Sequence, residues 1–148
     1  MAVVLAAIFF TPLHQLPAQN LSLQMHGMAT LAERSFFGGG VGGFWRDARR
    51  LGVGGSISLG EWDRELAGRG EIGVSYHLGA MDAGALGLYL GGGVAAAFAA
   101  RRSEQYLTVI VGLEQDSRGR GGWFAEAGIG GGVRVVAGYR ILLRRRGA

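Results

Sequence analysis

Apolar residues alternate with small or polar residues along most of the chain after residue 20. The clearest example is the segment 51–60, in which Leu51, Val53, Ile57 and Leu59 share one side and glycines and serines take the other. Successive side chains of a β-strand point to opposite faces, so this period of two predicts strands rather than helices. The same pattern predicts strands over 21–31, 37–45, 69–78, 86–98 and 106–114, and the polar segment 61–68 is predicted to be a loop.

The stretch 122–143 allows two interpretations. It is either one long strand, which gives seven strands in all, or a hairpin that folds back at the three glycines of 130–132, which gives eight. A three-residue loop at these glycines would pair Ile129 with Val133, and both residues belong to the apolar side. This parity favours the hairpin, and therefore eight strands.

The two faces of the predicted strands differ in side-chain size. One carries Leu, Val, Ile and Phe, whereas the other carries Gly, Ala, Ser, Thr and charges of both signs. Small side chains suit the interior of an eight-stranded barrel, where little room is left. An arginine or lysine on a lipid-facing wall costs about 2–4 kcal/mol at mid-depth. We therefore expect the apolar face to point outward to lipid, and we expect lumenal ion pairs among the charged residues of the other face: Arg69, Glu71, Glu114, Glu126, Arg134 and Arg140.

The dimensions and the aromatic residues agree with a membrane barrel. A tilted strand of about 11 residues covers the apolar band, about 25 Å tall, of an outer-membrane barrel. Aromatic residues of such barrels gather at the two membrane interfaces. The outward-facing aromatic residues near predicted strand ends are the expected interface residues: Phe37, Trp45, Tyr76, Phe98 and Trp123.

The first residues resemble an export signal. An apolar run covers Ala2 to Phe10, and Pro17 is followed by the small residue Ala18, as at a secretory cleavage site. We expect residues 1–18 to be a signal peptide and 19–148 to be one barrel domain. The alternative is that the apolar run forms a buried first strand or helix.

Composition narrows the possible chemistry. Glycine supplies 29 of the 148 residues, and a match to the phosphate-loop spacing at Gly38, Gly40 and Gly43 is expected to be coincidental because no helical pattern follows it. The chain has no cysteine and its three histidines are scattered, so neither a metal site nor a cofactor is expected. The net charge is +4, but the basic residues are dispersed, which argues against a nucleic-acid partner.

An export signal followed by eight amphipathic strands with glycine-rich inner faces resembles the small outer-membrane β-barrel proteins of Gram-negative bacteria, the OmpA-like type. The resemblance covers Leu21 to Leu143. It implies an all-β, antiparallel up-and-down transmembrane barrel. It also implies that both termini lie in the periplasm, with short turns on that side and loops outside. One departure is that the last strand ends in Ile141, Leu142 and Leu143 rather than in an aromatic residue.

Three functions remain open. The leading one is a non-enzymatic outer-membrane protein, monomeric, with a structural, adhesive or interaction role. Its partners would be outer-membrane lipids, lipopolysaccharide and the barrel-assembly machinery. Its lumen would be closed by Tyr89, Tyr106, Phe124 and ion pairs, so it would not be an open porin.

The second is a lipid-modifying enzyme that uses Ser75 as nucleophile and His77 as base, with Glu71 nearby on the same face of the strand. The third is a helical membrane protein with a span at 83–100, since these eighteen residues carry no charge.

Overall fold

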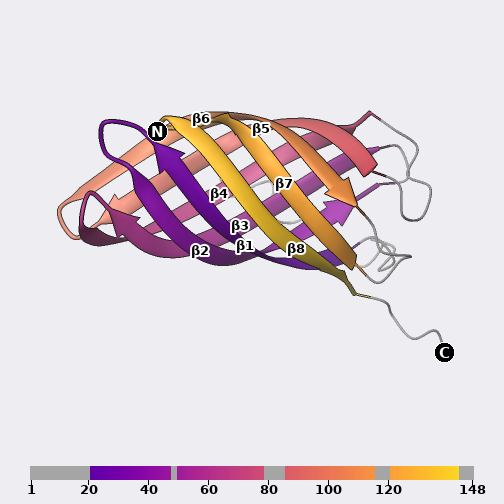
Figure 1. Ribbon diagram of the computed structural model, residues 1–148, viewed down its shortest axis with the longest axis horizontal. Helices are drawn as coiled ribbons and strands as arrows, with labels where there is room; N and C mark the ends of the chain where they lie inside the picture. The colour runs from indigo at the N-terminus through magenta and orange to yellow at the C-terminus, as the bar shows by residue number, and fades with distance from the viewer. Residues whose placement is uncertain (1–20, 48–49, 79–85, 116–120, 144–148) are drawn as a thin grey trace, which may run out of the picture.

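A computed structural model describes residues 21–47, 50–78, 86–115 and 121–143. These residues form eight strands, shown in Figure 1. The strands are β1 (Leu21–Leu31), β2 (Phe36–Arg46), β3 (Leu51–Trp62), β4 (Glu65–His77), β5 (Leu86–Ala99), β6 (Arg102–Gln115), β7 (Gly121–Ile129) and β8 (Val133–Leu142). The predicted all-β class is confirmed.

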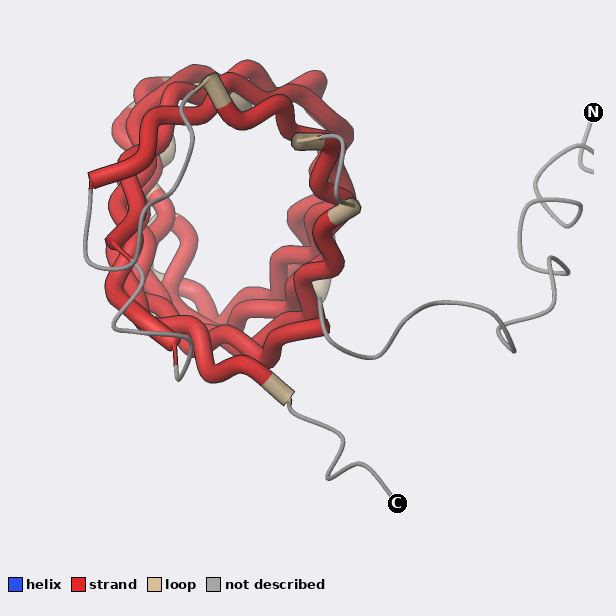
Figure 2. The backbone as a smooth tube through the Cα atoms, turned by 90° about the vertical axis from the view of Figure 1, so that its right-hand side faces the viewer, coloured by secondary structure: helices blue, strands red, loops and turns tan. Residues whose placement is uncertain are grey.

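Each strand pairs antiparallel with its neighbour in sequence, and β8 pairs with β1, so the sheet closes into a barrel (Figure 2). The closing register runs from Ser22 opposite Leu142 to Leu31 opposite Val133. Closure satisfies the backbone groups that would otherwise be exposed along two sheet edges. The up-and-down antiparallel barrel is therefore confirmed.

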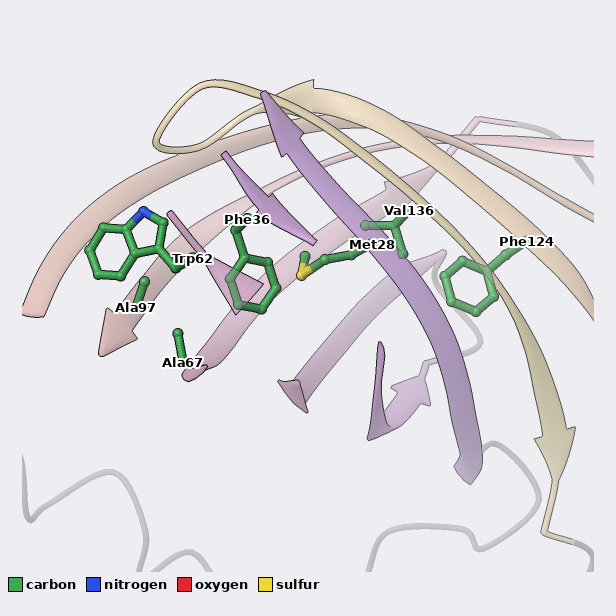
Figure 3. Packing of buried hydrophobic residues seen from close by; sticks show 7 residues of the cluster. All are labelled: Met28, Phe36, Trp62, Ala67, Ala97, Phe124 and Val136. Atoms are coloured by element: carbon green, nitrogen blue, oxygen red, sulfur yellow. The ribbon is translucent and has the colours of Figure 1, made fainter. Parts of the chain in front are cut away.

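The predicted orientation of the two faces is also confirmed. Large apolar side chains point outward, with Leu59 70% exposed and Ile57 68% exposed. Inward-facing residues are buried, and Tyr89 is 1% exposed. Figure 3 shows side chains of the small internal cluster, which consists of Met28, Phe36, Trp62, Ala67, Ala97, Phe124 and Val136. The barrel thus exposes most of its bulky hydrocarbon, the reverse of a water-soluble fold.

Close packing of neighbouring strands explains part of the glycine content. A Cβ atom built on Gly93 would lie 2.2 Å from the backbone oxygen of Ile72 on β4, and one built on Gly40 would lie 2.2 Å from the oxygen of Ile57 on β3. Only glycine fits where two backbones approach this closely. The close approach of the strands therefore gives these inner glycines a structural reason.

The prediction of a polar loop over 61–68 is wrong. β3 continues to Trp62 and β4 begins at Glu65, so only Asp63 and Arg64 connect them. Their φ angles are 53° and 67°, as in the two-residue turns whose twist matches that of paired strands. The polar residues on either side of this turn lie on strand ends, which is why composition alone suggested a loop.

The hairpin interpretation of 122–143 is confirmed. β7 and β8 are joined by residues 130–132, and Ile129 pairs with Val133. Gly131 and Gly132 have φ angles of 76° and 138°, which favour glycine. The eight-strand count follows from this turn.

The helical span at 83–100 is wrong. Leu86–Ala99 is the extended strand β5, paired on both sides with β4 and β6, while residues 83–85 lie outside the described part of the chain. Among the described residues, no helix has the length and apolar character needed to cross a membrane.

The lengths of the connections do not match what the family resemblance implied. β1 begins and β8 ends at the same end of the barrel, where the backbone N–H of Leu143 donates to the oxygen of Leu21 at 2.8 Å. Connections at this end cover 47–50, 78–85 and 116–120, whereas those at the opposite end cover only 32–35, 63–64, 100–101 and 130–132. The short turns therefore lie away from the termini.

Candidate functional site in the barrel lumen

A row of alternating cations and carboxylates runs through the lumen. Glu71 on β4 accepts hydrogen bonds from Arg69 Nε at 2.8 Å and from Arg134 Nη2 at 2.6 Å. Arg134 on β8 also donates from Nη1 to Glu126 Oε2 on β7 at 2.8 Å. Their side chains are 2–13% exposed. Buried charges of this kind persist only when they are paired, and here each has a partner of opposite sign.

The row continues toward the end of the barrel that carries the termini. Arg140 Nη2 lies 3.6 Å from Glu126 Oε1, and Arg140 Nη1 donates to Glu114 Oε2 at 2.6 Å. Glu114 on β6 also accepts a hydrogen bond from Arg46 at the end of β2. We call the residues from Arg69 to Arg46 the ion ladder, and its members are Arg69, Glu71, Arg134, Glu126, Arg140, Glu114 and Arg46.

The structure brings together all six charged residues that the sequence placed on the inner face. Arg46 is the one ladder residue that was not among the predicted lumenal ion pairs. Its inward parity could be seen in the sequence, but its position also allowed a turn after the second strand, whereas the structure makes it the last residue of β2.

Aromatic rings surround the ladder at Arg140. Its guanidinium carbon lies 4.1 Å from the ring centre of Phe44 and 4.3 Å from that of Phe124. Tyr89 lies 5.5 Å away and donates its hydroxyl to Glu126 at 2.8 Å. Cation–π contacts of this kind gain strength when water is excluded. Together these side chains form a cluster in the lumen near its terminal end.

A second group of side chains lies at the opposite end of the barrel. Phe36 and Trp62 are 2% and 3% exposed, and the Arg102 guanidinium lies 5.1 Å from the Trp62 ring. Above them, Arg102 pairs with Asp63 at 3.5 Å and with Glu65 at 3.4 Å. This rim joins the β3–β4 turn to the start of β6.

Comparison with known proteins places this barrel among solved structures. No protein-family model matches the chain, and no curated protein matches it in sequence. The N-terminal β-barrel domain of Pseudomonas aeruginosa OprF has 15% identity and a TM-score of 0.53, with 81% of this chain and 94% of that chain covered. Neisserial surface protein A has 12% identity and a TM-score of 0.54, with 83% and 96% covered.

The fold is that of a small outer-membrane β-barrel. At these identities the likeness concerns the fold alone. Because both comparisons cover nearly the whole of the other chain, the described residues correspond to one complete barrel of this type.

In this barrel fold, Ser75 and His77 both face the lumen. Ser75 Oγ lies 3.5 Å from His77 Nε2, and His77 Nδ1 lies 2.9 Å from Glu114 Oε1. The carboxylate beside Ser75 and His77 is therefore that of Glu114. Glu71, the carboxylate that the sequence suggested for this role, instead binds two arginines of the ladder.

This group has the spacing of a nucleophile and its base, and it lies inside the barrel. Ser75 is 7% exposed and His77 is 2% exposed, so neither reaches the lipid-facing wall. The His77 Nδ1 atom makes no well-directed hydrogen bond, and Glu114 is shared with two arginines. These contacts tie His77 to the ion ladder.

The predicted interface aromatics point outward. Phe37, Tyr76, Phe98 and Trp123 are 40–54% exposed, and Trp45 is half-buried in the outer wall. All lie within a few residues of a strand end. Trp123 also donates its indole N–H to Gln115 Oε1 at 2.7 Å. Trp62, which lies within the predicted loop 61–68, ends β3 and points inward.

Metal binding finds no support in the described part of the chain, where no three His, Cys, Asp or Glu side chains gather closely enough to hold an ion. His26 and His77 are lumenal and apart, with His26 Nε2 lying 2.9 Å from Ser58 Oγ. His14 lies outside the described residues.

Proposed function

We propose that this chain is an integral outer-membrane protein whose lumen is closed to ion flow and whose role is structural or interactive rather than enzymatic. The observation that carries the proposal is the reversed distribution of side chains, with bulky apolar residues outside and an ion ladder inside. Only a lipid environment stabilises such an exposed apolar wall, because a monomeric soluble protein rarely presents a large continuous apolar surface to water.

The proposal of a closed lumen is supported by the ladder and by the side-chain clusters at the two ends of the barrel. An ion that crosses the barrel would have to separate paired charges whose side chains are only 2–13% exposed along most of the row. It would also have to pass Arg140 between the rings of Phe44 and Phe124. These contacts support a barrel without steady conductance.

The connections favour a structural role over an adhesive one. Away from the termini the strands are joined by very short turns, which leave little surface for binding another cell or a soluble protein. Among the described residues, the largest surface available for partners is the lipid-facing wall. We expect outer-membrane lipids and lipopolysaccharide there, insertion by the barrel-assembly machinery, removal of residues 1–18 on export, and a monomer.

Two measurements test the proposal. The purified barrel should migrate differently on gels before and after heating, as folded outer-membrane barrels do, and it should fractionate with the outer membrane. In planar lipid bilayers it should show no large stable conductance. Steady porin-like conductance of the unmodified protein, or a water-soluble folded monomer, would refute the proposal.

The enzymatic alternative has a separate test. We expect no lipid hydrolysis by the barrel in vesicles that contain lipopolysaccharide, and the same background for Ser75→Ala and His77→Ala. Hydrolysis by the unmodified protein that is lost in both variants would establish the Ser75, His77 and Glu114 group as catalytic.

A further inference from the structure

One strand lacks a neighbour at the end of the barrel that lies away from the termini. β6 pairs with β5 over its whole length, from Arg102 to Gln115, but its pairing with β7 covers only Val109 to Glu114. Residues 102–108 of β6 therefore have β5 on one side and no described strand on the other. Figure 1 shows the β5–β6 hairpin reaching further than the β7–β8 turn at this end. We call this segment of β6 the free edge.

The backbone of the free edge has hydrogen-bonding groups that no described strand uses. Along an antiparallel strand, the N–H and C=O groups of successive residues point alternately to its two neighbours. Every second residue of the free edge therefore directs both groups away from β5. Such an edge is a template for pairing with another chain, and proteins usually protect it with charged side chains, proline, bulges or a covering loop.

The side chains of the free edge do not protect it. Its outward-facing residues are Ser103, Gln105 and Leu107, which are exposed and uncharged. Its two charged residues, Arg102 and Glu104, face the inside of the rim, where each lies near a side chain of opposite charge. The segment contains no proline, and its pairing with β5 proceeds without a bulge. The free edge can therefore accept a further strand.

The β7–β8 turn, which lies next to the free edge, leaves room for such a strand. Residues 130–132 of this turn are all glycine, so the turn has no side chain that could cover the edge. A Cβ atom on Gly131 would lie 2.7 Å from the Tyr106 ring, so the turn packs directly against that ring. Arg69 Nη2 holds the turn in place by donating to the Gly130 oxygen at 2.9 Å.

Two arginines near the free edge contact carboxylates only at long distances. Arg34 of the β1–β2 turn is 54% exposed and lies 3.9 Å from Asp63 and 3.7 Å from Glu104. Arg102 lies 3.5 Å from Asp63 and 3.4 Å from Glu65. A charge-assisted hydrogen bond between a guanidinium nitrogen and a carboxylate oxygen is about 2.7–2.9 Å long. Both guanidinium groups can therefore donate to a further carboxylate.

We propose that the free edge binds an extended, acidic segment of a partner polypeptide, which adds to the barrel as a further strand. Main-chain hydrogen bonds give strand addition its affinity, and side chains at alternate positions give it specificity. The specificity here comes from a carboxylate on the inner side of the added strand, which binds Arg102 or Arg34. Strand addition needs one extended segment and no broad surface, so it fits a monomeric barrel with short turns. This inference goes beyond the proposed structural role.

Disulfide trapping in phospholipid vesicles tests the inference, because the chain has no cysteine of its own. The probe is the peptide acetyl-Glu-Thr-Thr-Cys-Thr-Thr-Glu-amide, activated as its thionitrobenzoate disulfide. With its cysteine opposite residue 105, one glutamate lies opposite Arg102 in either strand direction. Gln105→Cys should react at least tenfold faster than Glu61→Cys, which is exposed on the outward face of the same rim but lies between two paired strands. Each rate is divided by that of the same variant with Ellman's reagent, which corrects for thiol reactivity.

Two altered peptides separate strand addition from simple charge attraction. N-methylation of the threonines removes backbone donors and should abolish the advantage of Gln105→Cys, and lysine in place of glutamate should reduce it. Equal rates at the two positions, an undiminished rate with the N-methylated peptide, or equal rates with the acidic and basic peptides would overturn the proposal. Disulfide-linked dimers of Gln105→Cys that form without peptide would also overturn it, by assigning the edge to a second copy.

Controls keep this test independent of the proposed function. Heat-dependent gel mobility establishes that each variant is folded, and Ser103→Cys takes the place of Gln105→Cys if the latter does not fold. Steady conductance would refute the closed lumen without changing these rates, so failure of the strand-addition proposal is distinct from failure of the closed-lumen proposal.

Discussion

Removing the central carboxylate of the ion ladder is expected to destabilise the barrel strongly. Glu71 is the carboxylate that joins Arg69 to Arg134, whose side chains are 2% and 6% exposed. Glu71→Gln keeps the size of the side chain and removes its charge. Breaking a buried ion pair costs about 3–5 kcal/mol, since the partner is left charged and unpaired.

We expect Glu71→Gln to lower the free energy of unfolding by about 3 kcal/mol, at the lower end of that range. Arg134 would keep Glu126 at 2.8 Å, and Arg69 would keep its hydrogen bond to the Gly130 oxygen at 2.9 Å. The remaining contacts leave the two guanidinium groups partly satisfied. The expected loss of stability is therefore that of removing one carboxylate that the two guanidinium groups share.

Urea unfolding in phospholipid vesicles, followed by tryptophan fluorescence, measures this loss. Glu65→Gln is the matched control, because it removes a carboxylate of the rim that lies 3.4 Å from Arg102 and is 48% exposed. An exposed pair contributes about 0–1 kcal/mol, so the control should stay near the unmodified protein. Equal losses in the two variants, or a loss below about 1 kcal/mol for Glu71→Gln, would show that the ladder does not stabilise the fold.

Three further outcomes are expected. Ile57→Arg, in the middle of the outer wall of β3, should lower the free energy of unfolding in vesicles by about 2–4 kcal/mol. Leu66→Arg, near the β3–β4 turn, should lower it by about 0–1 kcal/mol. Equal losses in the two variants would contradict the proposed membrane depth. Arg64→Gly should stabilise the barrel by about 1 kcal/mol in urea unfolding, because the φ angle of Arg64 is 67°, a conformation that glycine adopts without strain. Gly131→Ala should destabilise the barrel, because the φ angle of Gly131 is 76°. Ser75→Ala should change the free energy of unfolding by no more than about 1 kcal/mol, because the Ser75 hydroxyl is uncharged and its 3.5 Å contact with His77 is a long hydrogen bond. A larger loss would show that this hydroxyl has a structural role.

The orientation of the wall could be predicted from the sequence because it depends on a local rule. Side chains alternate strictly along a strand, so Ile57 and Ser58 had to face opposite ways wherever the strand lay. The difference in size between the two sets of side chains then indicated which face met lipid. The hairpin at 130–132 followed from the same parity, through the pairing of Ile129 with Val133.

The connections were less accessible to sequence reasoning. Asp63 and Arg64 adopt positive φ angles without a glycine, so no residue type marked the two-residue turn. The direction in which the short turns point also departs from the pattern of the resembling family. Both features depend on how neighbouring hairpins end relative to one another, which strand periodicity does not specify.

The sequence by itself determined the strands apart from the ends of β3 and β4, the face that each residue occupies, and six of the seven charges of the ion ladder. Only the tertiary structure decided which charges meet, because Glu114 reaches Arg140, Arg46 and His77 from three other strands once the barrel has closed. It also decided where the wall lacks a strand beside Tyr106. The physical reason is that alternation is a property of one strand, whereas register and closure fix which residues of distant strands share the same level of the lumen.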